Sequence, residues 1–140
     1  MSYRLDEAAF ASWLDAYKAA WEARDPAAAA ALFTPQASYH EMPFDPPIEG
    51  AEAIADYWAK AVAGQEGVTF TYDILACTGD IGLCHWHCAF TGVPGGEAID
   101  LDGVFHCRFA EADRVDRFRE WWHVRVAAAD PPAARGPRQI

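Results

Sequence analysis

The first half of the chain carries apolar side chains at helical spacing, which predicts three helices. Between residues 6 and 24 the apolar positions recur at intervals of three and four, so they form one face of a helix. Asp25 followed by Pro26 is typical of a helix start, and this second, alanine-rich helix is expected to reach Phe33. A third apolar face predicts a helix over residues 51–63.

In the second half of the chain the period changes to two, which predicts strands. One strand begins at Val68, and three more are expected over residues 81–91, 98–109 and 114–126, with short turns between them. An earlier short strand, residues 37–42, lies between the second and third helices. Strands that follow one another through tight turns pair in antiparallel fashion, so these segments are expected to form one sheet.

The order of these elements predicts an α+β fold. Helix, helix, strand, helix and four meandering strands give a curved, mostly antiparallel sheet wrapped around three N-terminal helices. Helices on the concave face enclose a cone-shaped space, whose wide end is expected to be a small-molecule pocket. Residues 1–126 would form this single domain, and residues 127–140, an Ala/Pro/Arg-rich tail, are expected to be disordered or extended.

Two adjacent tryptophans in the last strand indicate that both faces of the sheet are covered. Neighbouring strand residues point to opposite faces, so Trp122 shares one face with Phe118 and Glu120, and Trp121 shares the other with Arg119. We expect the Trp122 face to meet the helices and the pocket. The Trp121 face, rich in arginine and tryptophan, is expected to meet a second copy of the chain, so we predict a homodimer through the convex face.

The composition narrows the range of partners. The net charge of −10 argues against nucleic acid and against anionic membrane surfaces, because both attract basic proteins. The start of the chain lacks the apolar core of a signal peptide, and no apolar run approaches the length of a membrane span. None of the four cysteines belongs to a CxxC pair, so we expect reduced thiols and a cytoplasmic location.

Four segments together resemble the nuclear transport factor 2-like superfamily, and in particular its SnoaL-like branch. In chain order they are ARDPAAAAALFTPQASYHEMPF, PPIEGAEAIADYW, LDGVF and DRVDRFREWW, and the resemblance covers about residues 5–126. It implies the cone-shaped fold. The activity stays open, because the superfamily includes ketosteroid isomerases, polyketide cyclases, epoxide hydrolases, dehydratases and non-catalytic binding proteins.

The resemblance to ketosteroid isomerases also implies roles for single residues. It aligns Tyr17 with their oxyanion-hole tyrosine, Glu41 with their general-base carboxylate and Trp122 with a pocket-lining tryptophan. Phe105 falls where those enzymes keep a protonated aspartate as the second donor to the enolate oxygen. This departure argues against steroid isomerisation, because that reaction relies on two donors.

The residues themselves support an acid–base site around Glu41. Glu41 shares a strand face with Tyr39 and precedes a proline-rich segment, so it is expected at the pocket rim. Partial burial there raises the pKa of a carboxyl group. Tyr17 lies on the buried helix face and is expected to donate a hydrogen bond into the cavity. The structural alternatives are a solvated glutamate at a strand end and a tyrosine that belongs to the core.

Glu120 and the histidines leave alternatives open. If Glu120 faces the helices, it is a second buried acid that shares proton transfer with Glu41; alternatively it pairs with an arginine of the last strands. His85 and His87 share a strand face and could hold a metal, but no third ligand stands at a diagnostic spacing, so we expect no metal. Periodicity buries the opposite face with Trp86, whereas the isomerase comparison turns His87 inward; we favour His87 near the pocket.

The sequence thus predicts a cofactor-free enzyme that uses Glu41 as base and Tyr17 as donor on a small apolar carbonyl or epoxide compound. The predicted pocket-lining residues are Trp21, Trp58, His87, Phe105, Phe118, Glu120 and Trp122. The alternative is a dimer that binds a small ligand or has a structural role, without turnover. A cavity in which Glu41 has no basic neighbour would favour the enzyme, and a pairing with arginine would favour the binding protein.

Overall fold

The computed structural model describes residues 3–127, which form three helices and six strands. The helices are α1 (Glu7–Glu22), α2 (Pro26–Ala30) and α3 (Ala51–Ala63). The strands are β1 (Phe33–His40), β2 (Ile48–Glu49), β3 (Gln65–Thr78), β4 (Ile81–Gly92), β5 (Ala98–Glu111) and β6 (Arg114–Ala127). The tail predicted over residues 127–140 lies outside the described residues, except for Ala127 at the end of β6. No helix in this part of the chain is long and apolar enough to cross a membrane.

The helix starts follow from their capping residues. Asp6 and Asp25 each accept a hydrogen bond from a backbone N–H in the first turn of α1 and α2, at 2.8 Å and 3.1 Å. The third helix spans the predicted residues. The α2 helix ends at Ala30 rather than Phe33, because Phe33 already belongs to β1 and pairs with Val115 of β6.

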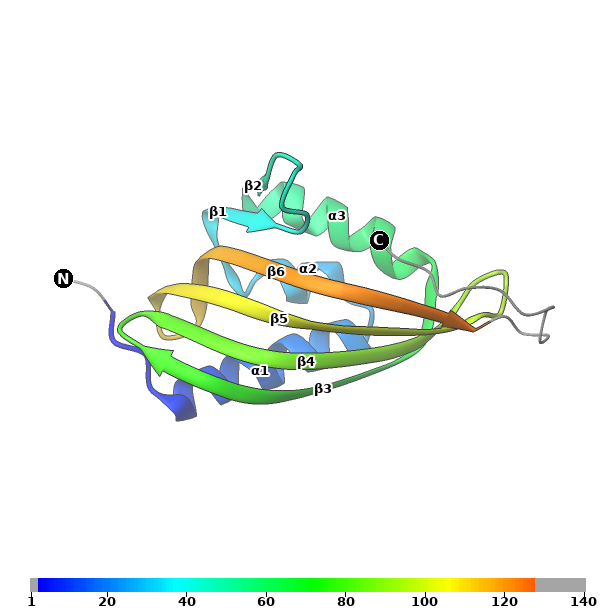
Figure 1. The fold of residues 1–140 in the computed structure, drawn as a ribbon. Coiled ribbons are helices and arrows are strands. Elements are labelled where there is room, and N and C mark those ends of the chain that lie inside the picture. The colour runs from blue at the N-terminus through cyan, green and yellow to red at the C-terminus, as the bar shows by residue number, and fades with distance from the viewer. Residues whose placement is uncertain (1–2, 128–140) are drawn as a thin grey trace.

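The strands form one sheet in the order β2-β1-β6-β5-β4-β3 (Figure 1). All neighbouring strands are antiparallel except β1 and β6, which run parallel. The first strand ends at His40, whereas the sequence predicted residues 37–42, so Glu41 lies just beyond it. The curved, mostly antiparallel α+β architecture predicted from the element order is confirmed.

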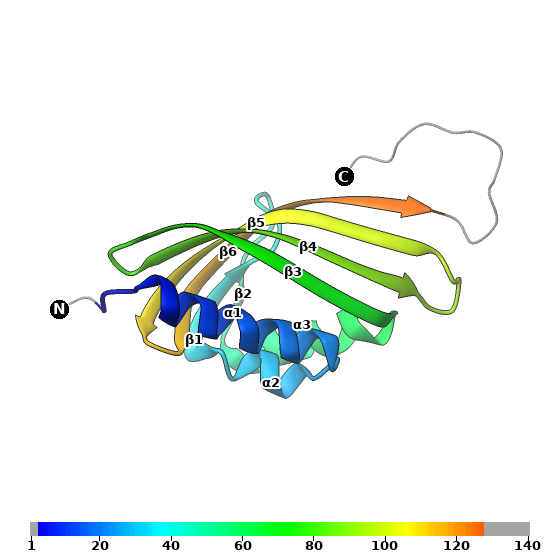
Figure 2. The same cartoon turned by 90° about the horizontal axis from the view of Figure 1, so that it is seen from below.

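All three helices cover the same face of the sheet, and no described helix covers the other face (Figure 2). The α1 helix approaches the sheet closely at Gly82 of β4, where an added Cβ would lie 2.7 Å from the Phe10 ring. A larger residue at this position would push α1 away from the sheet. The backbone N–H of Leu5 donates to the carbonyl of Gly79 at 2.8 Å, which ties the start of α1 to the turn between β3 and β4.

The core between helices and sheet is largely aromatic. Tyr17 of α1 lies among its rings, with centroid distances of 5.1 Å to Phe105, 5.5 Å to Trp58 and 5.6 Å to Phe70. Rings at such separations in tilted or edge-on arrangements stabilise a core beyond the burial of their area. The position of Tyr17 is therefore fixed by packing from α3, β3 and β5 together.

Candidate active site

A cavity of about 300 Å³ lies between the helices and the inward face of the sheet. Its wall comes from α1, α3, the residues at the end of β1, and strands β3 to β6. Eight of the lining residues are aromatic: Tyr17, Trp21, Tyr39, Tyr57, Trp58, Trp86, Phe90 and Trp122. A wall of this kind suits a ligand that is largely apolar.

A second hollow, of about 420 Å³, adjoins the cavity beside the loop that follows β1. Glu41, Glu120 and Trp122 border both spaces, so the two carboxyl groups stand where the hollows meet. The loop itself carries Phe44, which is 98% exposed. Glu41 and Glu120 are thus reachable from the loop side as well as from the aromatic cavity.

The two tryptophans of β6 separate as their alternation predicts. Trp122 lines the cavity, whereas Trp121 stands on the opposite face and is 47% exposed. Gly103 lies between Trp122 and Trp86 in one row of the sheet, and an added Cβ there would lie 2.8 Å from the Cβ of Trp122. The glycine therefore allows β6 to approach β5 closely, and the two indoles on either side of it in this row form part of the cavity wall.

Six predicted site residues lie on the cavity wall, and three do not. Those on the wall are Tyr17, Trp21, Glu41, Trp58, Glu120 and Trp122. Phe105 and Phe118 are fully buried behind the wall, where their rings pack against Tyr17 at centroid distances of 5.1 Å and 6.0 Å. The prediction was wrong for these two because periodicity gives the face of a strand and not the depth at which a ring packs.

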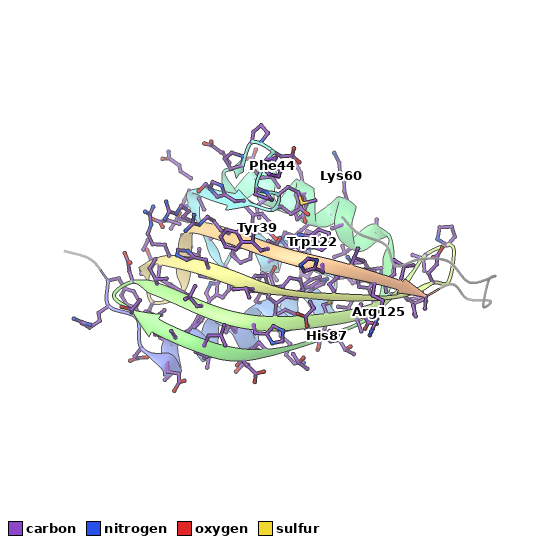
Figure 3. All side chains as sticks on the ribbon, viewed as in Figure 1. Tyr39, Phe44, Lys60, His87, Trp122 and Arg125 are labelled. Carbon is purple, nitrogen blue, oxygen red and sulfur yellow. The ribbon has the colours of Figure 1, made fainter. Side chains whose placement is uncertain are left out.

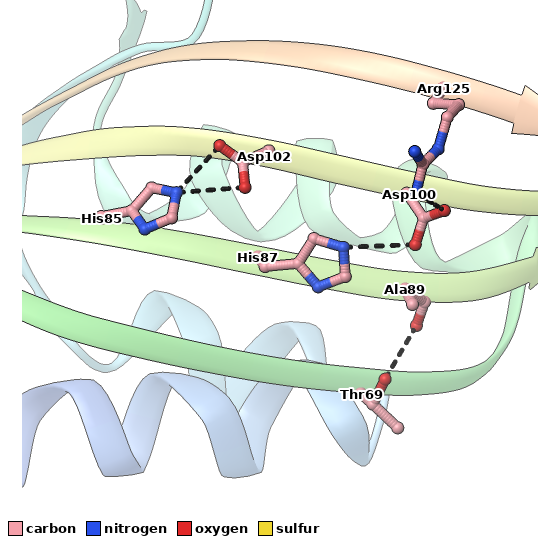
Figure 4. Close-up of polar contacts among 7 residues, drawn as sticks. All are labelled: Thr69, His85, His87, Ala89, Asp100, Asp102 and Arg125. Atoms are coloured by element: carbon pink, nitrogen blue, oxygen red, sulfur yellow. Dashed lines mark hydrogen bonds and ion pairs between the residues drawn. The ribbon is translucent and has the colours of Figure 1, made fainter.

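The prediction that His87 lies near the pocket was also wrong. Cys84, Trp86 and Cys88 point inward along β4, as periodicity indicates, so His85 and His87 point outward. Nε2 of His87 lies 3.2 Å from Asp100 and Nε2 of His85 lies 2.9 Å from Asp102, on the face without helices (Figures 3 and 4). Within residues 3–127 no group of three or more His, Cys, Asp or Glu side chains could hold a metal ion.

Sheet register brings Glu41 next to Glu120. The parallel strands β1 and β6 place His40 opposite Arg119, and Glu41 and Glu120 directly follow these two residues in the sequence. Both residues line the cavity. Neither forms an ion pair with a described residue, and no Lys, Arg or His of the described chain lines the cavity. The expected alternative, an arginine partner for Glu120, is therefore wrong.

The surroundings of the two carboxyl groups favour their protonated forms. Glu120 is only 7% exposed; burial raises its pKa well above the ordinary 4.5, and the charge of Glu41 raises it further. The Tyr39 hydroxyl, within hydrogen-bonding reach, partly offsets this rise. Burial also raises the pKa of the half-buried Glu41, helped by the charge of Asp45 and opposed by the Trp122 indole N–H.

Three tyrosine hydroxyls complete the polar part of the wall. Burial raises the pKa of Tyr17, Tyr39 and Tyr57, and the charge of Glu120 raises each of the three further. All three therefore remain protonated hydrogen-bond donors at neutral pH. The sequence indicated only Tyr17 as a donor, because Tyr39 and Tyr57 stand out merely as members of a strand face and a helix face.

Gln65, the first residue of β3, is a wall residue that the sequence did not indicate. Its side-chain oxygen accepts a hydrogen bond from the indole N–H of Trp21 at 2.8 Å. Its backbone carbonyl accepts another from the Arg24 guanidinium at 2.9 Å. The only signal near it is Gly64, which ends α3, and that signal marks a turn rather than a site.

Several solved structures share this fold. A putative isomerase from Bacillus subtilis superposes with a TM-score of 0.74 at 17% identity, covering 84% of this chain and 89% of that one. An epoxide hydrolase/cyclase-like enzyme of pyran ring formation in the polyether salinomycin gives 0.72 at 19% identity, covering 84% and 92%. A protein of ketosteroid isomerase-like fold from Catenulispora acidiphila, in complex with trimethylamine, gives 0.68 at 18% identity, covering 78% and 83%.

Identities this low establish a common fold and leave the activity open. A search of curated proteins finds no significant match. The sequence itself matches the SnoaL-like domain family over residues 14–118, which includes the second half of α1, α2, α3 and most of the sheet. This stretch contains most of the cavity wall, including Tyr17 and Glu41, and ends two residues before Glu120. The chain therefore belongs to the SnoaL-like domain family.

Proposed function

We propose that the protein is a cofactor-free acid–base enzyme for a small, largely apolar molecule with a carbonyl or epoxide oxygen. One observation carries the proposal: Glu41 and Glu120 face one aromatic cavity, and no cationic side chain of the described residues neutralises them. The charge of Glu41 raises the pKa of Glu120, so the two carboxyl groups do not ionise independently, and ionisation of one favours the protonated form of the other. Such a pair can accept one proton and donate another.

In this proposal Glu41 is the base and Glu120 is the acid. Glu41 is half-buried, whereas Glu120 is only 7% exposed, so Glu41 loses its proton more readily than Glu120. Glu41 removes a proton from a carbon next to a carbonyl, or from a water molecule that opens an epoxide. Glu120 donates to the oxygen on which negative charge develops, and Tyr17 provides a second donor.

Glu120 can replace the second hydrogen-bond donor to an enolate oxygen, which Phe105 cannot provide. Phe105 stands where the ketosteroid isomerase resemblance expects a protonated aspartate, and its buried ring packs against Tyr17. Glu120 is the direct partner of Phe105 across β5 and β6. A carboxyl group on the neighbouring strand is thus available in the same row of the sheet, which supports chemistry that passes through an enolate.

Two structural neighbours are compatible with this chemistry. One is described as a putative isomerase and another as an epoxide hydrolase/cyclase-like enzyme, and both kinds of reaction require proton transfer. Binding without turnover is the second candidate, because the aromatic wall would hold an apolar ligand whatever the carboxyl groups do. The neighbour in complex with trimethylamine illustrates a small ligand held in the same fold.

The proposal is tested by proton exchange and turnover in matched variants. Cyclic ketones and epoxides that stabilise the protein in a thermal-shift screen are incubated in deuterated buffer, and exchange at the carbon next to the carbonyl, or epoxide opening, is followed by NMR. Glu41→Gln is expected to lower the rate by about 10² to 10⁴-fold, because it removes the base. Glu52→Gln, an exposed position on α3, is the control and should keep the wild-type rate.

Two outcomes count against the acid–base proposal. An unchanged rate in Glu41→Gln would exclude Glu41 as the base. Tight binding of several ketones and epoxides without exchange or opening in the wild-type protein would favour the binding protein. Tyr17→Phe, which keeps the ring in the core, should lower the rate less than Glu41→Gln, because Glu120 still supplies a donor.

A further inference from the structure

The cavity has a polar group remote from the carboxyl pair that the acid–base chemistry does not use. Gln65 starts the edge strand β3, and strands β4 and β5 separate it from Glu120 on β6. The two residues also lie in different rows of the sheet: Gln65 pairs with Gly92, whereas the row of Glu120 passes through Phe105 to Cys84. Gln65 and Glu120 thus stand at opposite ends of the space that a ligand would occupy.

The hydrogen bond from Trp21 fixes which way the Gln65 amide faces. An indole N–H is only a donor, so the atom that it meets at 2.8 Å is the amide oxygen. The NH2 group is then the other end of the amide, and it has no acceptor within residues 3–127. It is not one of the fully enclosed polar atoms, in contrast to the indole nitrogens of Trp58 and Trp86. Since Gln65 is only 8% exposed and lines the cavity, the open space that its NH2 group meets is the cavity.

The Gln65 side chain is also held in place before any ligand arrives. Its backbone is tied to Arg24 at 2.9 Å and pairs with Gly92 of β4, and its side-chain oxygen is held by Trp21. A donor that is already oriented loses little conformational entropy when a ligand binds. It also leaves an unpaired buried donor when the ligand offers no acceptor, which weakens binding.

We propose that Gln65 determines specificity by donating a hydrogen bond from its NH2 group to an oxygen on the end of the ligand remote from the reacting carbon. The inference rests on the proposed function for one point, that the reacting end lies at Glu41 and Glu120. The ligand class is a two-ended molecule that is apolar in the middle and carries a ketone, ether or hydroxyl oxygen at the Gln65 end. The aromatic wall between the two ends accommodates the apolar middle.

The experiment compares two ketones of the same size. They are 4-cyclohexylcyclohexanone, with one oxygen, and bicyclohexane-4,4′-dione, with an oxygen at each end. Calorimetry is expected to show that the wild-type protein binds the diketone about fivefold to tenfold more tightly. In Gln65→Met, which keeps the length of the side chain but removes the donor, this preference should disappear. The Trp21 indole loses its acceptor with both ligands, so the ratio of the two affinities isolates the NH2 group.

A second readout uses the wild-type protein alone. In ¹⁵N-labelled protein the side-chain NH2 signals of Gln65 should shift on addition of the diketone and stay in place with the monoketone. Glu66→Gln, an exposed neighbour on β3, is the control and should keep the preference for the diketone. An unchanged preference in Gln65→Met would overturn the inference, and so would a wild-type protein that binds neither ketone or binds both equally.

The two proposals fail separately. Glu41→Gln should slow proton exchange by about 10² to 10⁴-fold. It should leave the preference for the diketone intact, because Gln65 is remote from the carboxyl pair. Suppose that the wild-type protein catalyses no proton exchange, but prefers the diketone, and that Gln65→Met lacks this preference. The acid–base proposal is then wrong and the role of Gln65 stands. If exchange depends on Glu41 and the preference does not depend on Gln65, the reverse holds.

Discussion

Glu120 is a carboxyl group that the fold buries among tyrosines, with no cation of the described chain to balance its charge. Burial of an ionised carboxylate is costly, and the raised pKa of Glu120 is the consequence. Buried acids without a partner are rare in positions that serve stability alone, because an apolar residue would pack there at lower cost. The pair of Glu41 and Glu120 is therefore the feature of the chain that points most strongly to chemistry.

Replacing Glu120 by Gln should stabilise the folded protein above neutral pH. A raised pKa means that the folded state binds the proton more tightly than the unfolded state, so wild-type stability falls as pH rises from about 4.5 toward the folded-state pKa. Gln mimics the protonated carboxyl and escapes this loss. Urea denaturation should show similar stabilities near pH 4 and a gain of about 1 kcal/mol or more for Glu120→Gln near pH 8. A variant that is less stable than the wild type near pH 8 would contradict the account.

Single residues were predictable where alternation along one strand decides their direction. The inward Trp122 and outward Trp121 follow from the pattern alone, and the same pattern would have placed His87 outside had the resemblance to isomerases not outweighed it. The orientation of Gln65 in the cavity could not be predicted from the sequence, because it depends on Trp21, which lies 44 positions away. A hydrogen bond of that range leaves no periodic signal.

At the scale of elements, Gly103 of β5 affects both the pairing of β5 with β6 and the position of the cavity-lining Trp122. An added Cβ would meet the backbone oxygen of Trp121 and lie 2.8 Å from the Cβ of Trp122. Gly103→Ala should therefore displace β6 and lower the free energy of unfolding by about 1–3 kcal/mol. Ketone affinity should fall as well, because Trp122 forms part of the wall. Denaturation and calorimetry measure the two effects.

The matched control for this change is Gly64→Ala at the end of α3. There an added Cβ would meet only the carbonyl oxygen of Val93, at 3.8 Å, and the backbone φ of −99° suits any residue. Stability and affinity should change little. Equal effects of the two substitutions would show that the crowding between β5 and β6 does not matter.

Element ends were predictable where the signal is local and missed where pairing is long-range. The caps Asp6 and Asp25 define the helix starts within one turn. The parallel pairing of β1 with β6 joins segments from opposite ends of the chain, and it extends β1 back to Phe33. That register also makes Glu41 and Glu120 neighbours, so the central pair of the site could be suspected from sequence but not placed.

At the scale of the whole molecule, the face of the sheet without helices is expected to meet a second copy of the chain. It exposes Trp121, with the Arg119 guanidinium 5.5 Å from the ring centroid. The same face carries the outward pairs His85–Asp102 and His87–Asp100 (Figure 4). A large aromatic with arginine beside it is typical of an interface. We therefore expect a homodimer by sedimentation velocity.

Trp121→Glu should shift this association toward monomer, because it places a carboxylate in the expected contact. Glu52→Gln is the control: Glu52 is exposed on α3, which lies on the helix-covered side of the sheet (Figure 2), so its loss should leave the mass unchanged. A monomeric wild-type protein, or dimers unaffected by Trp121→Glu, would contradict the assignment of this face.

The central claim is that two uncompensated carboxyl groups share one apolar cavity, and a carboxyl titration followed by ¹³C NMR tests it most directly. Glu120 should titrate well above the ordinary 4.5, and Glu41 should also titrate above it. In Glu41→Gln the pKa of Glu120 should fall, because the neighbouring charge that raises it is gone. A Glu120 that titrates at or below 4.5 in the wild-type protein, unaffected by Glu41→Gln, would contradict the account.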